Sequence, residues 1–275
     1  MINIVADSCC DLRETIKTDE YSFVTVPFTF EFDNASYVDD DSIDINALLN
    51  SIETCKEAGK TACPPAGMWY EYFKQEGDAI AVTISSNLSG SYNSACAAKQ
   101  MILEEFPDKK VAVIDVKSTG PENAMTINHM IEDIKNHKSF EEVVDGANEF
   151  ARVTHTIFTL SSFNNLIKNG RMSAIKGLIA EKLGFWGIGI GSDEGTIEVI
   201  DKVRGEGKTA RRIVEVIKEN RSGNLITISH VNNIDMANRI KDELLAYDPN
   251  IKIDILETRG LDSFYAERGG IIIGY

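Results

Sequence analysis

The stretch AIAVTISSNLSGSYNSA, residues 79–95, decides the fold of this chain. Residues 79–84 are an unbroken apolar run, which predicts a buried β-strand. A polar segment follows at residues 85–90, and helical spacing then extends over residues 92–105. A strand that is apolar on both faces and leads at once into a helix is typical of a parallel sheet covered by helices on both sides. The sequence therefore predicts an α/β fold.

Two other stretches repeat this pattern. Residues 2–6 (INIVA) are apolar and end at a polar turn, and residues 110–115 (KVAVID) lead through a polar turn into another helical pattern. Residues 23–32 predict one or two strands, because Pro27 cannot lie in the middle of a central strand. In parallel sheets of this kind, ligands bind beyond the carboxyl ends of the strands.

The second half of the chain has a different pattern. Its β-rich runs do not alternate regularly with helices, and Asp193-Glu194-Gly195 is a hairpin signal between two of them. We expect mixed or antiparallel pairing in an α+β unit. Strands are expected here over residues 155–160, 185–191, 196–200, 224–230, 251–257 and 270–273. Helices of the whole chain are expected over residues 43–58, 92–105, 173–183, 208–219 and 234–246, and another is expected from the polar turn after residue 115 to about residue 137.

The charge distribution also changes along the chain. The 275 residues include 28 Lys and Arg against 43 Asp and Glu, a formal charge of −15. Residues 1–153 hold 12 basic and 27 acidic side chains, which accounts for the whole difference, and residues 154–275 hold 16 of each. We therefore expect two domains, a parallel α/β domain at 1–153 and a mixed-sheet α+β domain at 154–275.

Composition and charge limit the classes of function. With 43% hydrophobic residues, the chain has the composition of an ordinary globular protein. Its acidity argues against nucleic acid as a partner and against prolonged residence on an anionic membrane. No run of about 18 apolar residues predicts a membrane span, and the N-terminus lacks the features of a signal peptide. Five cysteines without a CxxC pair indicate free thiols, so we expect a cytoplasmic protein.

Several motifs have simple interpretations. GIGIG at 187–191 precedes a hairpin rather than a helix, so it indicates close packing or the floor of a ligand site, not a dinucleotide loop. GEGKT at 205–209 lacks the first glycine of a phosphate-binding loop. The aspartates at 39–41 predict a solvated turn before the helix that follows, since the spacing of a calcium loop is absent. The four histidines show no zinc-ligand spacing.

Residues 85–94 (SSNLSGSYNS) are the strongest candidate for a ligand site. Hydroxyl groups and free backbone N–H groups at a helix N-terminus bind anions such as a carboxylate or a phosphate. N-capping by Ser89 or Ser91 is the simpler explanation. Capping needs only one hydroxyl, so the excess of hydroxyls favours a ligand.

Further motifs occur in order along nearly the whole chain. They are ADS and DL within residues 6–12, VPF at 26–28, Thr61 with Pro64, ISSNLSGSYNSA at 84–95, ID and KS within 114–118, LIKNGRMS at 166–173 and KVRG at 202–205. Together they resemble the motifs of DegV-like proteins, the fatty-acid-binding subunits (FakB type) of bacterial fatty acid kinase. The segment at 84–95 is the most specific match, because it is close to the family's ISSxLSGTYxSA.

The resemblance implies a Rossmann-like domain followed by a mixed-sheet domain, the DegV and dihydroxyacetone-kinase-like architecture. One long-chain fatty acid, such as palmitate or stearate, would be buried between the two. Hydroxyl and backbone donors would hold its carboxylate, and they correspond here to Thr61, Ser89, Gly90 and Ser91. The acyl chain needs an apolar tunnel, for which the candidates are Phe28, Phe158, Phe163, Leu166, Phe185, Ile188, Ile190 and Ile272.

The resemblance also implies partners. A separate ATP-dependent kinase subunit would phosphorylate the bound acid, and Arg171 and Arg204 correspond to arginines implicated in docking that kinase. This chain would have no catalysis and no metal of its own, and would act as a monomer. Its net charge predicts that its contact with membranes is transient.

The sequence departs from the family at the carboxylate end. Ala62, Cys63 and Pro65 replace residues of the TSQPS loop, and Tyr265 stands where the family has a histidine. A phenol can still donate a hydrogen bond to a carboxylate.

Two other functions stay open. One is an enzyme that captures a small polar ligand through His155 or His230, and the other is a regulatory protein whose bound lipid is structural.

Overall fold

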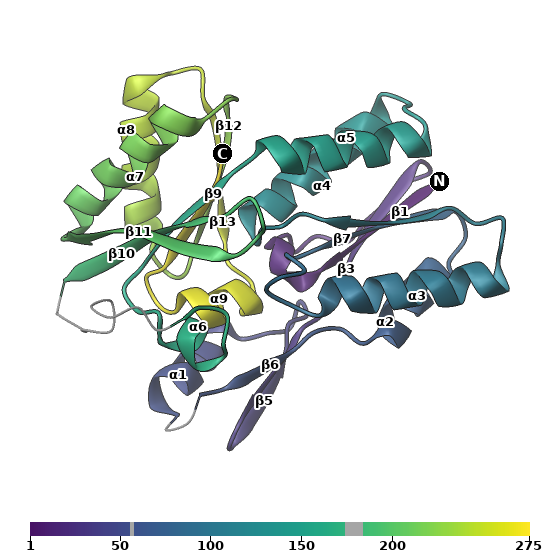
Figure 1. The fold of residues 1–275 in the computed structure, drawn as a ribbon, viewed down its shortest axis with the longest axis horizontal. Helices are drawn as coiled ribbons and strands as arrows, with labels where there is room; N and C mark the ends of the chain where they lie inside the picture. Colours follow the sequence, from purple (N-terminus) through teal and green to yellow (C-terminus); the bar gives the residue numbers. More distant parts are fainter. Residues whose placement is uncertain (56–57, 174–183) are drawn as a thin grey trace.

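The computed structural model describes residues 1–55, 58–173 and 184–275. Two large β-sheets and one small sheet form the framework, and helices cover both large sheets (Figure 1). The predicted helix over 173–183 lies, except for its first residue, outside the described residues. The α/β class predicted from the sequence is confirmed.

The five-stranded sheet has the order β2-β3-β1-β7-β8. Strands β3, β1, β7 and β8 are parallel to one another, and the short edge strand β2 is antiparallel to β3. The three apolar runs predicted as buried strands became β1, β7 and β8. The strands are β1 (Ile2–Asp7), β2 (Ile16–Lys17), β3 (Tyr21–Val26), β7 (Asp78–Thr83) and β8 (Val111–Asp115).

Helices cover both faces of this sheet, which explains why its strands are apolar throughout. Val5 and Ala81 pack under α2 and α3 on one face, whereas Ile4 and Ile80 pack under α4 and α5 on the other. Alternate residues of a strand point to opposite faces, so each strand supplies both cores. The helices are α2 (Ala66–Phe73), α3 (Ser91–Glu105), α4 (Pro121–Lys135) and α5 (Phe140–Val153).

The six-stranded sheet has the order β11-β10-β9-β14-β12-β13, with only the β12–β13 pair parallel among these described strands. The predicted mixed pairing and the hairpin between β10 and β11 are confirmed. Helices α7 and α8 pack on one face over an Ile-rich core. The elements are β9 (Thr156–Leu160), β10 (Phe185–Gly191), β11 (Ile197–Arg204), β12 (Leu225–His230), β13 (Lys252–Glu257), β14 (Ile271–Gly274), α7 (Glu206–Asn220) and α8 (Ile234–Tyr247).

The third sheet is small, with the order β5-β4-β6, and it lies beside helix α9. Pro27 separates β3 from β4, so residues 23–32 form two strands. Residues 60–62, expected as a loop between helices, form strand β6 instead. The remaining elements are η1 (Ser8–Cys10), β4 (Thr29–Phe32), β5 (Ala35–Val38), β6 (Lys60–Ala62), α1 (Ile45–Thr54), α6 (Asn164–Lys168) and α9 (Gly260–Ala266).

The two large sheets come from different parts of the chain, residues 2–115 and residues 156–274. Helix α4 packs both on the first sheet and against β12 and β14 of the second. Gly274 lies so close to Met125 and Glu122 of α4 that a side chain would not fit there. The predicted boundary at residue 153 coincides with the end of α5, and the division into two domains stays a prediction. Within the described ranges no helix is long and apolar enough to cross a membrane.

Candidate functional site

A cavity with mostly apolar walls lies between the two large sheets. Its first wall comes from the segments after the carboxyl ends of β7 and β8, as expected for ligand sites in parallel sheets. The second wall is the face of the six-stranded sheet that α7 and α8 leave uncovered. Helix α9 and the small sheet form the rest. The residues around it include Ile84, Leu88, Ser89, Ser118, Thr119, Leu160, Ile197, Leu261 and Ala266.

One end of this cavity has a pair of hydroxyl groups. The Oη atom of Tyr265 on α9 lies 2.9 Å from the Oγ1 atom of Thr61 on β6, and both residues line the cavity. Burial raises the pKa of Tyr265 above its ordinary value, so the phenol keeps its proton at neutral pH. Two neutral donors therefore meet at one place, where they can bind a carboxylate.

Arg171 joins the same end of the cavity. Its guanidinium carbon lies 5.7 Å from the centre of the Tyr265 ring, and its Nε donates to the carbonyl of Leu88 at 3.2 Å. A second donation, from Nη1 to the carbonyl of Asn169 at 2.6 Å, fixes the side chain further. The sequence resemblance implies only kinase docking for Arg171. Its position places a cation beside the two hydroxyl groups as well.

The serine-rich turn contributes only in part. Ser89 lines the cavity, and its Oγ accepts a hydrogen bond from the backbone N–H of Ser91 at 3.3 Å. Gly90, the N-cap of α3, is exposed and does not line the cavity. Ser91 is fully buried, and its Oγ donates to Asp7 at 2.6 Å instead of facing the cavity. Of the three predicted residues of this turn, one lies at the cavity.

Asp7 at the end of β1 holds the serine-rich segment from behind. Its carboxylate also accepts from the backbone N–H of Ile84 at 3.0 Å and from the thiol of Cys9 at 2.9 Å. Burial raises the pKa of Asp7 to about 6, and these hydrogen bonds limit the increase. The sequence pattern gave no sign of this contact, because residues 7 and 91 are 84 positions apart.

Four of the eight predicted tunnel residues line the cavity: Phe28, Phe158, Leu166 and Ile272. Phe163 packs behind Phe158, with ring centres 6.3 Å apart. The remaining three, Phe185, Ile188 and Ile190, are not among the lining residues.

The placement of Ile188 and Ile190 in the tunnel was wrong because it ignored the alternation of side chains along β10. Both residues point to the other face of the sheet, into the core under α7 and α8. The glycines that alternate with them face the cavity side, where Gly189 pairs with Phe158. A Cβ atom on Gly189 would collide with the Phe158 ring, so close packing explains the GIGIG pattern.

Phe185 lies at the start of β10, away from the cavity. Lys202 and Arg204 of β11 place their cationic groups 5.4 Å and 5.7 Å from the centre of its ring. Arg204 is therefore an exposed residue at the far end of the β10–β11 hairpin, whereas Arg171 is at the cavity. The pairing of these two arginines in one kinase-docking surface stays a prediction.

The β10–β11 turn closes one side of the cavity. Ser85 Oγ donates to the carbonyl of Gly195 at 2.7 Å, and Asn87 Nδ2 donates to the carbonyl of Glu194 at 2.5 Å. Lys117 Nζ approaches the carbonyl of Asp193 at 3.4 Å. Side chains after β7 and β8 thus bind three successive carbonyls of the turn, and Gly195 itself lines the cavity.

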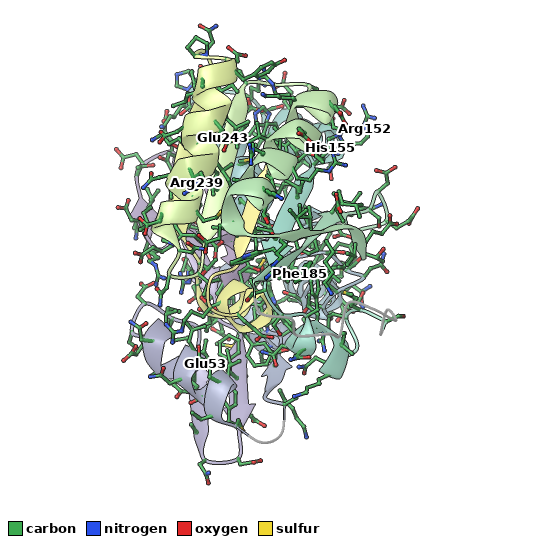
Figure 2. All side chains as sticks on the ribbon, turned by 90° about the vertical axis from the view of Figure 1, so that its left-hand side faces the viewer. Glu53, Arg152, His155, Phe185, Arg239 and Glu243 are labelled. Carbon is green, nitrogen blue, oxygen red and sulfur yellow. The ribbon has the colours of Figure 1, made fainter. Side chains whose placement is uncertain are left out.

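The two histidines of the alternative enzyme hypothesis lie elsewhere. His155 lines a neighbouring polar cleft together with Arg152 (Figure 2), and this cleft shares Lys117, Thr156 and Gly191 with the apolar cavity. His230 is 5% exposed, and its Nδ1 accepts from the backbone N–H of Asn233 at 3.3 Å. Burial lowers the pKa of His230. Neither histidine lines the apolar cavity. In the described part of the chain, no group of three or more His, Cys, Asp and Glu could hold a metal ion.

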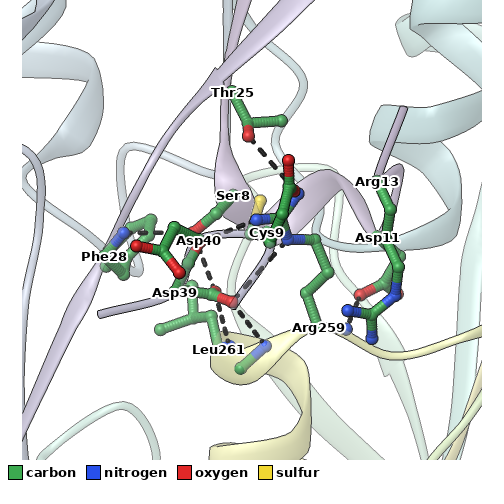
Figure 3. Close-up of polar contacts among 12 residues, drawn as sticks. Ser8, Cys9, Asp11, Arg13, Thr25, Phe28, Asp39, Asp40, Arg259 and Leu261 are labelled. Carbon is green, nitrogen blue, oxygen red and sulfur yellow. Dashed lines mark hydrogen bonds and ion pairs between the residues drawn. The ribbon is translucent and has the colours of Figure 1, made fainter. Parts of the chain in front are cut away.

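The predicted solvated turn at 39–41 is wrong for Asp39, which is fully buried. Its carboxylate accepts from the backbone N–H groups of Gly260 and Leu261, at 2.8 Å and 3.0 Å (Figure 3). Arg259, also fully buried, lies with its Nε 3.7 Å from the same carboxylate. The sequence suggested solvent because three adjacent aspartates are usually exposed, and Asp40 and Asp41 are. Asp39 is buried instead, because its hydrogen-bond partners come from a distant part of the chain.

Known proteins resemble this chain over its whole length. A family model described as "Uncharacterised protein, DegV family" matches residues 1–273. A DegV domain-containing protein of Streptococcus pneumoniae is 36% identical over 277 aligned positions, which cover 99% of this chain and 98% of the relative.

Two solved structures are similar in both sequence and fold. A DegV family protein from Eubacterium eligens, loaded with heptadecanoic acid, has a TM-score of 0.94 and 36% identity, and the match covers 100% of this chain and 99% of that one. The Streptococcus pneumoniae Fatty Acid Kinase (Fak) B3 protein, loaded with linoleic acid, has a TM-score of 0.95 and 35% identity, with 100% and 98% covered. On this agreement of motifs, fold and sequence, the chain belongs to the DegV family.

Proposed function

We propose that this protein binds one long-chain fatty acid, such as palmitate or stearate, in the apolar cavity. The observation that supports this most directly is the contact between Tyr265 and Thr61 in a cavity whose walls are mostly apolar. The fatty acids in the two similar structures have the same combination of one anionic group and a long apolar chain.

The carboxylate binds at the end formed by Thr61, Ser89 and Tyr265, with Arg171 as the neighbouring cation. The acyl chain extends along the walls that contain Phe28, Phe158, Leu166 and Ile272. Burial of each CH₂ group contributes about 0.8 kcal/mol, so the chain supplies most of the affinity and the head group supplies orientation.

The protein presents the bound carboxylate to a separate ATP-dependent kinase and has no catalysis of its own. The name of the Streptococcus pneumoniae relative supports this role, because it describes that protein as part of a fatty acid kinase. Arg171 and Arg204 are the residues proposed to contact the kinase. The protein acts in the cytoplasm as a monomer, does not bind nucleic acid, and contacts membranes transiently while exchanging its ligand.

Native mass spectrometry of the protein purified from cells tests the binding step. We expect an adduct with the mass of a C14–C18 fatty acid. Delipidated protein should regain the same adduct when palmitate is added, and its melting temperature should rise. A spectrum without adduct, together with no thermal shift, would contradict the proposal.

A kinase assay tests the second step separately. The loaded protein is incubated with ATP and a bacterial fatty acid kinase subunit, and the acyl phosphate is trapped with hydroxylamine. We expect product only when all three components are present. Binding without any acyl phosphate would limit the function to fatty acid binding.

A further inference from the structure

Tyr265 and Thr61 lie on secondary-structure elements that are distant in the chain. Thr61 is on β6, which pairs with β4 so that Thr61 faces Phe30 across the ladder. Tyr265 is on α9, a helix of seven residues near the C-terminus. Their contact at 2.9 Å therefore depends on how α9 is held against the β4–β6 pair.

Asp39 makes hydrogen bonds both to α9 and to the residue before β4. Its carboxylate accepts from Gly260 and Leu261, the first two N–H groups of α9, at 2.8 Å and 3.0 Å (Figure 3). Its own backbone N–H donates to the carbonyl of Phe28, the residue immediately before β4, at 2.8 Å. One residue thus fixes the beginning of the helix to the beginning of the strand.

Ser8 strengthens the same connection. Its Oγ donates to the Asp39 carboxylate at 2.8 Å and accepts from the backbone N–H of Phe28 at 3.1 Å. The guanidinium of Arg259 donates to the carbonyl of Asp39 at 2.8 Å. Asp39 and Arg259 are both fully buried, so their geometry is fixed by packing as well as by charge. Gly260 leaves the room that the carboxylate needs, because a Cβ there would lie 2.8 Å from it.

We propose that Asp39 is the positioning residue of the carboxylate-binding end of the cavity. It holds α9 against the β4–β6 pair and thereby sets the contact between Tyr265 and Thr61. Asp39 does not touch the ligand. The inference rests on the proposed function, because the property that it explains is affinity for an acid. It predicts that loss of the Asp39 carboxylate weakens binding of the acid because Tyr265 is displaced.

The variant Asp39→Asn tests this with little change in volume. An asparagine has one acceptor oxygen, so its NH₂ group would face the N–H of Gly260 or of Leu261, and α9 would shift. The matched control is Asp40→Asn, the next residue in the chain, which is exposed and bonds Ser42 within its own turn. Dissociation constants are measured by calorimetry for palmitic acid and for hexadecan-1-ol, which has the same chain without a carboxylate.

We expect Asp39→Asn to weaken palmitic acid binding by about tenfold or more, which corresponds to one lost hydrogen bond to a charged group. Binding of the alcohol should change by less than about threefold. In a Tyr265→Phe background, Asp39→Asn should add less than about threefold, because the group that it positions is already absent. Asp40→Asn should leave both affinities unchanged.

Two results would overturn the inference. Equal losses for acid and alcohol would show a purely structural role, and additive losses in the Tyr265→Phe background would show that Asp39 acts elsewhere. If Asp39→Asn does not fold, Ser8→Ala, which removes one donor to the same carboxylate, should show the same selective loss with a smaller size. Wild-type protein that binds no palmitic acid would refute the proposed function itself, which distinguishes the two failures.

Discussion

Tyr265 is the residue whose chemistry most affects the proposed site. Its phenol is an uncharged donor, and burial keeps its pKa above the ordinary value. A histidine at this position would change its charge near neutral pH, whereas a tyrosine does not. Ligand affinity should therefore show no step between pH 6 and 8 that depends on residue 265.

The variant Tyr265→Phe isolates the hydroxyl group. The ring remains, so the packing against Arg171 is retained, but one donor to the carboxylate is lost. We expect the dissociation constant for palmitate to rise about tenfold, as measured by calorimetry. Tyr37→Phe is the control, since its hydroxyl lies 2.7 Å from Ser51 Oγ outside the cavity. Unchanged affinity in Tyr265→Phe would refute this assignment.

Asp7 makes the stability of the fold depend on pH. Burial raises its pKa from 3.8 to about 6, so the folded protein binds this proton more tightly than the unfolded chain. The contribution to the free energy of unfolding is therefore full below about pH 4 and is lost as the pH rises through about 6, a change of about 3 kcal/mol.

Denaturant unfolding of the wild type and of Asp7→Asn between pH 4 and 7 measures this effect. The stability of the wild type relative to the variant should fall by about 3 kcal/mol across that range. Parallel curves for the wild type and Asp7→Asn would contradict the expected titration.

Sequence reasoning identified some site residues and missed others for clear physical reasons. Thr61 and Ser89 belong to segments with an unusual density of hydroxyl groups or prolines, which sequence reading can detect. Asp7 and Asp39 were missed because their partners are far away in the chain. A buried carboxylate is recognised by donors from other elements, and no local pattern predicts those.

At the level of elements, β10 shows how far periodicity can predict a site. Its alternation of glycine and isoleucine determines that the two residue types face opposite sides of the sheet. The side that each type faces depends on whether α7 and α8 or the cavity lies there. The side therefore depends on tertiary packing, and the predicted position of the two isoleucines in the tunnel is wrong for this reason.

The variant Gly189→Ala tests the glycine face of β10. The added methyl group would press on the Phe158 ring and push it toward the cavity. We expect a shift toward shorter acyl chains, with the preference for palmitate over laurate reduced about tenfold in competition binding. The control Ile188→Val, on the opposite face, should cost about 1 kcal/mol of stability without changing this preference. An unaltered chain-length preference in Gly189→Ala would rule out this arrangement of the wall.

The elements themselves were predicted with uneven success. Runs such as β1, β7 and β8 are apolar on both faces and end in polar turns, so their positions were evident. Strand β6 and helix α9 were not foreseen. Both are short, and they are stabilised by pairing with β4 and by the Asp39 carboxylate, respectively. Local propensity has little weight in such segments.

At the level of the whole molecule, several contacts join the two parts of the chain on either side of residue 153. Helix α4 packs against β12 and β14, and Arg259 donates from its backbone N–H to Asp11 at 2.7 Å. Ser118 and Thr156 lie with their hydroxyl oxygens 2.5 Å apart. These links are buried, so separating the two parts would leave polar groups without partners.

We therefore expect the ligand-free protein to unfold in a single transition. In differential scanning calorimetry the calorimetric enthalpy should equal the van't Hoff enthalpy. Palmitate should shift this one transition upward as a whole, because the cavity contains residues from both parts. Two resolved transitions would show that residues 1–153 and 154–275 unfold independently of each other.

The β10–β11 turn, held by Ser85, Asn87 and Lys117, has a consequence for the speed of exchange. We expect the bound fatty acid to leave only when this turn opens, so that its departure is a first-order event of the protein rather than a collision with an acceptor. Transfer of a labelled fatty acid to vesicles should then proceed at a rate independent of vesicle concentration. Asn87→Ala should raise that rate, and a rate proportional to vesicle concentration would exclude this gate. The residence time of the bound fatty acid is then determined by the protein and not by the amount of membrane present.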